Sequence, residues 1–206
     1  MVNKYLAEIN KDFNNDIVKS LLNQANNLKI PIITDEGIHF LIQLIKIHSS
    51  KKVLEIGSAI GYSSILMALF TDVTITTIER DEKIAKLALK NIKKANLSNR
   101  INLIIADAND VSISEDDFDL IFIDAAKASY INFFEKFAKN LKSNGLIICD
   151  NLLFKGQVNE PELIKSRNRR QLVKKIDKFN QYLINQENFD SYIYNIGDGI
   201  SISIKK

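Results

Sequence analysis

The feature that most constrains the fold is a regular alternation of short β-branched runs with longer amphipathic segments from residue 53 to residue 185. The apolar runs predict strands, and the segments between them predict helices. Repeated βαβ units imply an α/β fold with a doubly wound, mostly parallel sheet. The expected strands are Val53–Ile56, Thr74–Glu79, Ile101–Ala106, Asp119–Asp124 and Gly145–Asp150, and the expected helices are Tyr62–Phe70, Glu82–Ala95, Tyr130–Leu141 and Arg167–Asn185.

Further elements are expected at both ends of the chain. Apolar residues at helical spacing predict two N-terminal helices, over Asp12–Asn27 and Asp35–His48, with Pro31 interrupting the segment between them. Near the C-terminus, Tyr192–Ile196 and Ile200–Ile204 flank Gly197-Asp198-Gly199, and an Asp-Gly pair between two apolar runs predicts a hairpin.

Length and composition favour a single globular domain. The 206 residues are 46% hydrophobic and 26% charged, which is ordinary for a domain with one core. The single cysteine, Cys149, excludes a disulfide within the chain and fits a reducing compartment. Residues 1–15 lack the apolar stretch of a secretory signal, and no apolar run reaches membrane-spanning length. We therefore expect a cytoplasmic protein with no membrane partner.

The turn after the first expected strand predicts a nucleoside pocket. Gly57 ends that strand and Gly61 opens the next helix, where glycines allow a positive φ and close approach of a ligand. Glu79 ends the second strand, where a carboxylate can accept hydrogen bonds from ribose hydroxyls, and Asp107 follows the third, within reach of an adenine amino group. Ala59 stands at the middle position of a dinucleotide fingerprint, which favours a donor without phosphate, S-adenosylmethionine, but leaves NAD open.

The ends of the next two expected strands predict a metal site. Asp124 ends the fourth strand and Asp150-Asn151 ends the fifth, so neighbouring strands about 4.8 Å apart bring their side chains together. Two carboxylates and an amide oxygen suit Mg²⁺, or else Mn²⁺ or Ca²⁺. Lys127 follows Asp124 by three residues and is placed to take a proton from a substrate hydroxyl.

These motifs together resemble the class I O-methyltransferase family that includes the catechol and caffeoyl-CoA O-methyltransferases. They are Leu54-Glu55-Ile56-Gly57 with Gly61-Tyr62-Ser63, Asp124-Ala125-Ala126-Lys127, and Asp150-Asn151. The resemblance spans nearly the whole chain. It implies a Rossmann-like, seven-stranded sheet with an antiparallel last strand, a core over residues 51–206, and N-terminal helices over residues 1–50 with a substrate lid near Ile30–Thr34. It also implies a homodimer.

The same resemblance implies roles for individual residues. Lys127 and Asp124 would be catalytic, and Asp124, Asp150 and Asn151 would hold Mg²⁺ or Mn²⁺. The cofactor-binding residues would be Glu55, Gly57, Gly61, Ser63, Glu79, Asp107, Ala108 and Asp124.

A basic segment near the C-terminus suggests a nucleic-acid substrate. Residues 165–178 contain seven basic side chains and one acid, a charge of +6 in a chain whose net charge is +3. This segment, together with residues 150–158 and Gly197-Asp198-Gly199, is similar to the bacterial tRNA 5-hydroxyuridine methyltransferases. A basic stripe also suits contacts with phosphates, although a solvated helix face explains it about as well. The expected RNA-binding residues are Arg167, Arg169, Arg170 and Lys174.

Three hypotheses follow from the sequence. The first is methylation of 5-hydroxyuridine at the wobble position in the tRNA anticodon loop, giving 5-methoxyuridine. A 5-hydroxyuracil presents two adjacent oxygens, as a catechol does, and an unstacked base can enter a pocket. The second is methylation of a small molecule, either a catechol or a caffeoyl-CoA-type ester. The third is an NAD-dependent oxidoreductase.

Overall fold

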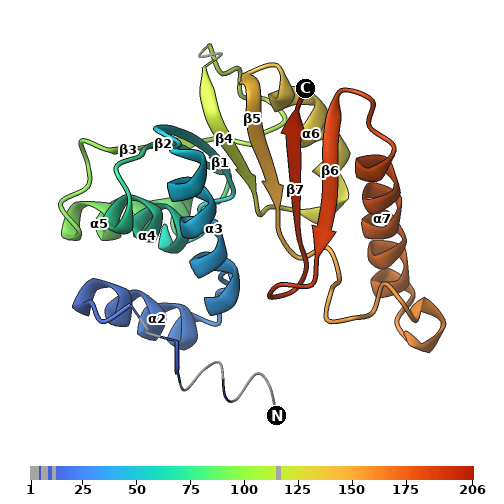
Figure 1. The fold of residues 1–206 in the computed structure, drawn as a ribbon. Helices are drawn as coiled ribbons and strands as arrows, with labels where there is room; N and C mark the ends of the chain where they lie inside the picture. Colours follow the sequence, from blue (N-terminus) through green and yellow to red (C-terminus); the bar gives the residue numbers. More distant parts are fainter. Residues whose placement is uncertain (1–4, 6–8, 11–12, 115–116) are drawn as a thin grey trace.

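A computed structural model of the chain describes residues 5, 9, 10, 13–114 and 117–206. A seven-stranded sheet lies at its centre, in the order β3-β2-β1-β4-β5-β7-β6, with helices on both faces (Figure 1). The strands are β1 (Lys52–Ile56), β2 (Thr74–Glu79), β3 (Ile101–Ile105), β4 (Phe118–Ile123), β5 (Leu141–Cys149), β6 (Phe189–Tyr194) and β7 (Ile200–Lys205). The expected Rossmann-like methyltransferase fold is therefore confirmed.

The sheet is mixed because of one strand. β1 to β5 pair in parallel, whereas β7 is antiparallel to both β5 and β6. The chain leaves β1 toward β2 and β3, and it returns to the other side of β1 as β4. This reversal between β1 and β4 is the topological switch point, where doubly wound sheets bind ligands beyond the carboxyl ends of their strands.

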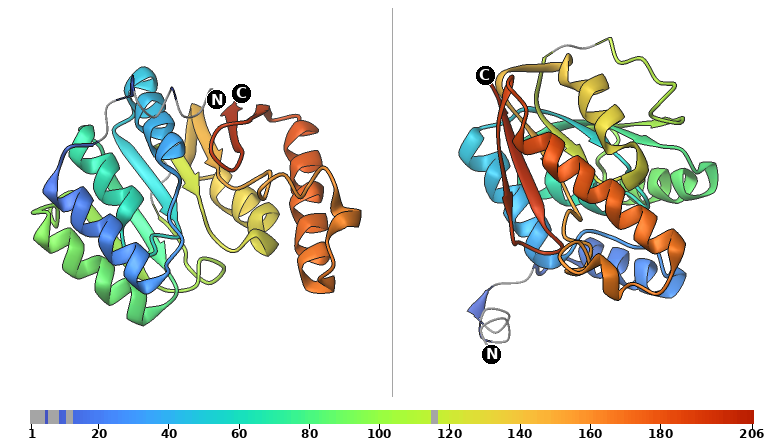
Figure 2. Two further views of the ribbon diagram at one scale, coloured as in Figure 1. Left: turned by 90° about the horizontal axis from the view of Figure 1, so that it is seen from below. Right: turned by 90° about the vertical axis from the view of Figure 1, so that its right-hand side faces the viewer.

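The helices divide between the two faces of the sheet. Figure 2 shows α4 and α5, with α2 outside them, on one side and α6 and α7 on the other. The helices are α2 (Asp16–Leu28), α3 (Asp35–His48), α4 (Tyr62–Phe70), α5 (Glu82–Lys94), α6 (Tyr130–Ala138) and α7 (Arg167–Ile184), with short 3₁₀ turns at Lys127–Ser129 and Pro161–Leu163. None of the helices described here is long and apolar enough to cross a membrane.

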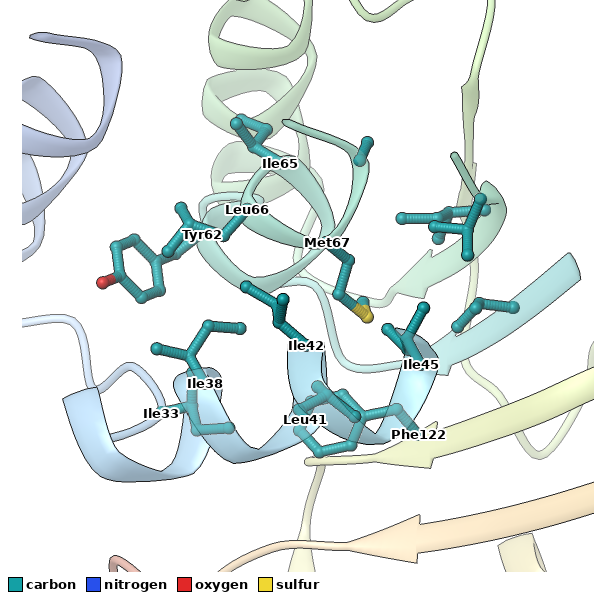
Figure 3. Close-up of a cluster of buried hydrophobic side chains, with 14 of the residues drawn as sticks. Ile33, Ile38, Leu41, Ile42, Ile45, Tyr62, Ile65, Leu66, Met67 and Phe122 are labelled. Atoms are coloured by element: carbon teal, nitrogen blue, oxygen red, sulfur yellow. The ribbon is translucent and has the colours of Figure 1, made fainter. Parts of the chain in front are cut away.

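Each face of the sheet has its own apolar cluster, because successive strand residues point to opposite sides. One cluster packs α2 to α5 on Val53, Leu120 and Ile148, and the other packs α6 and α7 on Leu54, Ile121 and Ile147. In Figure 3 the buried isoleucines of α3 meet Leu66 and Met67 of α4. The N-terminal helices are thus anchored to the core beside the first glycine turn.

Most of the expected elements are present, and the main differences lie at their ends. α2 begins at Asp16, because the Asn15 side chain caps it by accepting from the Ile17 and Val18 N–H groups. Asp12, the expected start, lies outside the described residues. α6 ends at Ala138, and β5 begins at Leu141 rather than Gly145, because Leu141 pairs with Phe118 across a register shift.

The last hairpin is also placed differently from the prediction. β6 starts at Phe189, three residues before the expected strand, and ends at Tyr194. It is the edge strand, and its polar residues Asp190 and Ser191 gave no apolar run to indicate a strand. Asn195 and Ile196 therefore belong to the turn before Gly197-Asp198-Gly199.

Candidate functional site

A cavity of about 300 Å³ lies at the switch point, beyond the carboxyl ends of β1 to β4. Its wall includes eight of the residues expected to bind a donor, a metal or a substrate. These are Gly57, Ser63, Glu79, Asp107, Ala108, Asp124, Lys127 and Asn151. The cavity therefore brings together residues from strand ends that are up to 94 positions apart in the sequence.

The first glycine turn has a steric reason for its composition. Gly57 has φ +98°, and a Cβ built on it would overlap the carbonyl oxygen of Asp124. Ala59, where a dinucleotide fingerprint has glycine, also adopts a left-handed conformation, with φ +46°. Its N–H donates to Glu79 Oε2 at 2.9 Å, which ties the turn to the end of β2.

The acids after β2 and β3 are oriented by backbone groups. Glu79 Oε1 accepts from the Asp81 N–H at 2.9 Å, so both oxygens of this half-buried carboxylate have partners. Asp107 Oδ1 accepts from the backbone and side-chain nitrogens of Asn109, at 2.9 and 2.8 Å. The backbone hydrogen bond from Asn109 lowers the pKa of Asp107. Both acids are thus oriented hydrogen-bond acceptors that line the cavity.

Two expected cofactor residues are not part of the cavity wall. The Glu55 side chain is fully buried and accepts hydrogen bonds from Ser63, Ser64 and Thr77, and burial raises its pKa. Gly61 has φ +83° and caps the start of α4, and a Cβ there would lie 3.5 Å from that of Ala88. The structure thus places Glu55 between β1, β2 and α4 and Gly61 against α5, and neither residue lines the cavity.

The metal candidates lie together at the ends of β4 and β5. Asp150 is 1% exposed; its Oδ1 accepts from the Asn151 N–H at 2.6 Å, and its Oδ2 has no hydrogen-bond partner among the described residues. Lys127 Nζ donates to Asn151 Oδ1 at 2.6 Å and lies 3.9 Å from Asp124 Oδ1. Asn151 has φ +64°, and Tyr130 donates its hydroxyl to the Asp150 carbonyl at 3.0 Å.

The electrostatics of this cluster fit a divalent cation. Burial raises the pKa of Asp124, with Glu55 adding to the shift and Lys127 opposing it. Burial, followed by the neighbouring Asp124, raises the pKa of Asp150 to about 7. A buried carboxylate oxygen without a partner is costly, and a cation would both satisfy it and separate the two like charges. No group of three or more His, Cys, Asp or Glu able to hold a metal exists in the described chain, so the donor set is two acids and one amide.

Several cavity residues were not predicted from the sequence. Ser58, Arg80 and Asn109 line it, and each directly follows a residue that was predicted. Pro31, Ile32 and Ile33 line it too, within the segment that was expected to supply a lid. Phe133 of α6 completes an apolar part of the wall. A position within four residues of a strand end was a usable signal for the first three, whereas the place of Phe133 depends on how α6 packs.

The expected RNA-binding residues lie elsewhere. Arg167, Arg169, Arg170 and Lys174 are all exposed on α7, and none lines the cavity at the switch point. None forms an ion pair with a carboxylate of the described residues, and the Arg169 guanidinium lies 5.8 Å from the Phe154 ring centre. Val173, Ile176, Phe179 and Leu183 lie on the buried face of the helix. The basic side chains are thus free to contact a partner.

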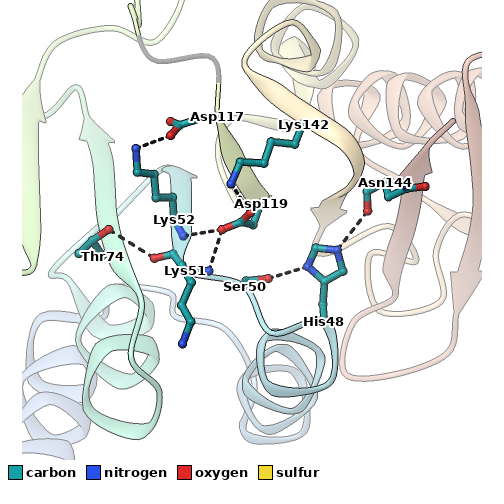
Figure 4. A network of polar contacts seen from close by, with 9 residues as sticks. All are labelled: His48, Ser50, Lys51, Lys52, Thr74, Asp117, Asp119, Lys142 and Asn144. Atoms are coloured by element: carbon teal, nitrogen blue, oxygen red, sulfur yellow. Dashed lines mark hydrogen bonds and ion pairs between the residues drawn. The ribbon is translucent and has the colours of Figure 1, made fainter.

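An acid at the other end of β4 has a structural role (Figure 4). Asp119 Oδ2 accepts from the Lys51 and Lys52 N–H groups at 2.8 Å each, and its Oδ1 accepts from Lys142 Nζ at 2.7 Å. Nearby, His48 links Ser50 to the Asn144 carbonyl. The two acids therefore differ: Asp119 accepts three hydrogen bonds that tie β4 to β1 and β5, whereas Asp124 lies beside Lys127 at the cavity.

Comparison with known proteins indicates the same kind of enzyme as the residues of the site. A model of the O-methyltransferase family matches residues 5–206. A caffeoyl-CoA O-methyltransferase of Populus kitakamiensis is 31% identical over 186 residues, which cover 86% of this chain and 78% of that protein.

Solved structures are similar over the whole chain. A Staphylococcus aureus protein provisionally named a caffeoyl-CoA O-methyltransferase is 35% identical, with a TM-score of 0.89 over 100% of this chain and 97% of that one. An O-methyltransferase from Bacillus cereus in complex with SAH is 26% identical, with a TM-score of 0.81 over 100% and 97% of the two chains.

Proposed function

The chain belongs to the O-methyltransferase family, and on that premise we propose that it methylates a hydroxyl on a ring that carries two adjacent oxygens. The methyl donor is S-adenosylmethionine, and a divalent cation, Mg²⁺ or Mn²⁺, assists. The observation that carries the proposal is Asp150 Oδ2, a buried carboxylate oxygen without a partner, beside Asp124 and Asn151. The third hypothesis from the sequence was an NAD-dependent oxidoreductase. Oxidoreduction is not the activity of this family.

The donor half of the cavity suits a nucleoside. Glu79 offers an oriented carboxylate that suits ribose hydroxyls, and Asp107 offers a second carboxylate that suits an adenine amino group. The Bacillus cereus relative, whose structure is a complex with SAH, supports this assignment. Because Gly57 has no side chain, the end of β1 can lie against the carbonyl of Asp124 at the cavity.

The acceptor half would hold the cation through Asp124, Asp150 and Asn151. A bound cation would acidify the acceptor hydroxyl and hold its neighbouring oxygen. Lys127 Nζ, fixed by Asn151, is placed to accept the hydroxyl proton as the oxygen bonds to the methyl carbon and the donor leaves as the thioether. Alignment of acceptor oxygen, methyl carbon and sulfur by the two halves supplies the rest of the catalysis.

A small aromatic acceptor fits this half best. Ile32, Ile33 and Phe133 are apolar residues that line the same cavity as Asp124, Lys127 and Asn151, and such a lining suits a ring with two oxygens at one edge. The Populus and Staphylococcus relatives carry the names of caffeoyl-CoA O-methyltransferases. We therefore take a catechol or a caffeoyl-CoA-type ester as the leading acceptor class.

One observation favours a second candidate, 5-hydroxyuridine at the wobble position of tRNA. The unpaired basic side chains of α7 follow each other at helical spacing and suit a phosphate backbone. A 5-hydroxyuracil offers the same pair of adjacent oxygens as a catechol, so the two candidates share the cavity and differ in their use of α7.

The activity is tested by incubating the purified protein with methyl-labelled S-adenosylmethionine, Mg²⁺ and either caffeoyl-CoA or catechol. We expect label in the acceptor, with transfer abolished by EDTA and restored by excess Mg²⁺. Transfer that continues undiminished in EDTA would contradict the cation site.

The two acceptor classes are separated by reversing charge on α7. In the double variant Arg169→Glu/Arg170→Glu, methylation of 5-hydroxyuridine-containing tRNA should fall at least about tenfold, while turnover of catechol stays within about twofold. The double variant Lys90→Glu/Lys93→Glu makes the same charge change on exposed residues of α5 and is the control. Failure of the wild type to methylate that tRNA at all would remove the second candidate.

Assembly stays a prediction. The homodimer implied by the family resemblance is measured by sedimentation equilibrium, where a mass near twice 23.4 kDa is the expected result.

A further inference from the structure

The turn Gly197-Asp198-Gly199 holds the segment that follows the proposed metal residues. The Leu152 N–H donates to the Gly199 carbonyl at 3.0 Å, and the Leu153 N–H donates to the Asp198 carbonyl at 2.9 Å. The Asp198 side chain accepts a further hydrogen bond from the Lys155 N–H. Three backbone donors of residues 152–155, which directly follow Asn151, are thus bound by one turn.

The same turn contacts the segment that lines the cavity from the other side. A Cβ on Gly197 would overlap Thr34 Oγ1, and the Gly197 N–H points at Glu36 Oε2 at 3.4 Å. Thr34 is the N-cap of α3, and it directly follows Ile33 of the cavity wall. The turn therefore lies between two segments that are more than 110 residues apart in the sequence.

The two glycines are required by these approaches. Gly197 and Gly199 have φ +57° and +90°, which glycine adopts without strain. A Cβ on Gly199 would lie 2.8 Å from the Leu153 nitrogen, in conflict with the hydrogen-bonded backbone it faces. Asp198 is the one residue of the turn with a side chain, and that side chain serves the 152–155 segment.

We propose that Asp198 is a positioning residue for the acceptor. It fixes residues 152–155, and through them Asn151, against the cavity wall formed by Ile32 and Ile33. The Leu152 carbonyl also accepts from Asn180 Nδ2 at 3.0 Å, so Asp198 sets the distal part of a segment whose start α7 already holds. The donor half is built from the ends of β1 to β3, and none of the described residues that line the cavity belongs to the turn. The nature of the bound acceptor rests on the proposed function, but the positioning of the segment does not.

The test compares three variants of the full chain. Asp198→Ala removes the side-chain acceptor, whereas Asp198→Asn keeps an oxygen for the Lys155 N–H. Asp190→Asn removes a carboxylate from an exposed position of β6 in the same hairpin and is the matched control.

The first measurement needs no activity. Amide hydrogen exchange of peptides covering residues 152–155, and tryptic cleavage after the exposed Lys155, should become at least about fivefold faster in Asp198→Ala. Both should stay within about twofold of wild type in Asp198→Asn and Asp190→Asn. Binding of S-adenosylmethionine by calorimetry should be unchanged in all three, which shows that the donor half is intact.

The second measurement is steady-state kinetics with caffeoyl-CoA as the probe acceptor. Asp198→Ala should raise the KM for this acceptor about five- to tenfold, with the KM for S-adenosylmethionine unchanged, and Asp198→Asn should restore it. Exchange in residues 152–155 that is unaffected by Asp198→Ala would overturn the inference, as would equal rises in both KM values. A wild-type protein inactive on caffeoyl-CoA would instead count against the proposed acceptor, while the exchange result still decides the positioning role.

Discussion

The donor half and the acceptor half of the cavity differ in how the protein satisfies their carboxylates. In the donor half, the Glu79 carboxylate has two backbone N–H partners, and Asp107 has its own turn to orient it. Beside the acceptor half, Asp150 is almost fully buried behind the cavity wall, and one of its oxygens has no partner in the described part of the chain. In the donor half the protein itself orients the carboxylates. In the acceptor half two carboxylates of like charge lie close together, and a cation would neutralise them. The donor half is thus preorganised for a neutral nucleoside. The acceptor half is preorganised for a cation, and without one its buried carboxylates lower the stability of the folded protein.

The largest expected effect comes from removing one charge from the acceptor half. Asp150→Asn should lower kcat/KM for caffeoyl-CoA about a thousandfold, because a site with one carboxylate holds a divalent cation weakly. Initial rates at saturating S-adenosylmethionine measure it, with Asp190→Asn as the control. Full activity in Asp150→Asn would contradict the claim that the acceptor half, unlike the donor half, depends on a bound cation.

The same residue predicts how stability depends on pH without a cation. The pKa of Asp150 is raised from 3.8 to about 7 in the folded protein, so below pH 4 the carboxyl is protonated in both the folded and unfolded states. Between pH 4 and 7 the unfolded chain ionises first, so wild type should lose up to about 4 kcal/mol relative to Asp150→Asn. Urea unfolding in EDTA from pH 4 to 8 measures this loss. Parallel curves for the two proteins would refute it, and added Mg²⁺ should reduce the difference.

The next largest effect is expected from a substitution at Gly57, the glycine at the boundary between the two halves. Gly57→Ala is expected to lose about 3 kcal/mol of stability, since its Cβ would overlap the Asp124 carbonyl and its φ is positive. Gly156→Ala is the matched control, because it also has a positive φ but nothing within 4 Å of the added Cβ. Equal losses in the two variants, measured by urea unfolding, would show that conformation and not the close approach to Asp124 matters.

A change confined to the donor half should leave the acceptor half unaffected. Glu79→Gln should weaken binding of S-adenosylmethionine about tenfold, because a neutral amide accepts more weakly and its NH₂ cannot replace both acceptor oxygens. Calorimetry measures the affinity, and Glu187→Gln, at an exposed position, is the control. Weakened Mg²⁺ binding in Glu79→Gln would mean that the halves are coupled.

The smallest effect has the opposite sign. Ala59→Gly should stabilise the protein by about 0.5 kcal/mol, because relief of the left-handed strain at φ +46° slightly exceeds the entropy that glycine adds to the unfolded chain. Thermal unfolding measures it, and donor affinity should stay within about twofold. A loss of stability would show that Ala59 makes contacts that outweigh its conformation.

Much of the fold was predictable because the spacing of apolar residues indicates where helices and strands lie. The helices Tyr62–Phe70 and Asp35–His48 and the strand Thr74–Glu79 have the predicted bounds, since each is bordered by a glycine, a polar cap or a charge. β6 was misplaced because an edge strand needs few apolar residues, and its pairing with β7 decides its bounds. The site followed from the fold, as parallel strands align their carboxyl ends at one edge.

The sequence by itself determined which chemical groups stand at the strand ends, and these groups favoured methyl transfer over hydride transfer. Only the tertiary structure decided which of them are available. Asp119 and Asp124 lie at the two ends of the same strand, yet only Asp119 receives backbone donors, from residues 51 and 52. Glu55 lies in the family motif but is enclosed by Ser63, Ser64 and Thr77. The physical reason is that hydrogen-bond partners and burial come from segments distant in the chain, which no local pattern records.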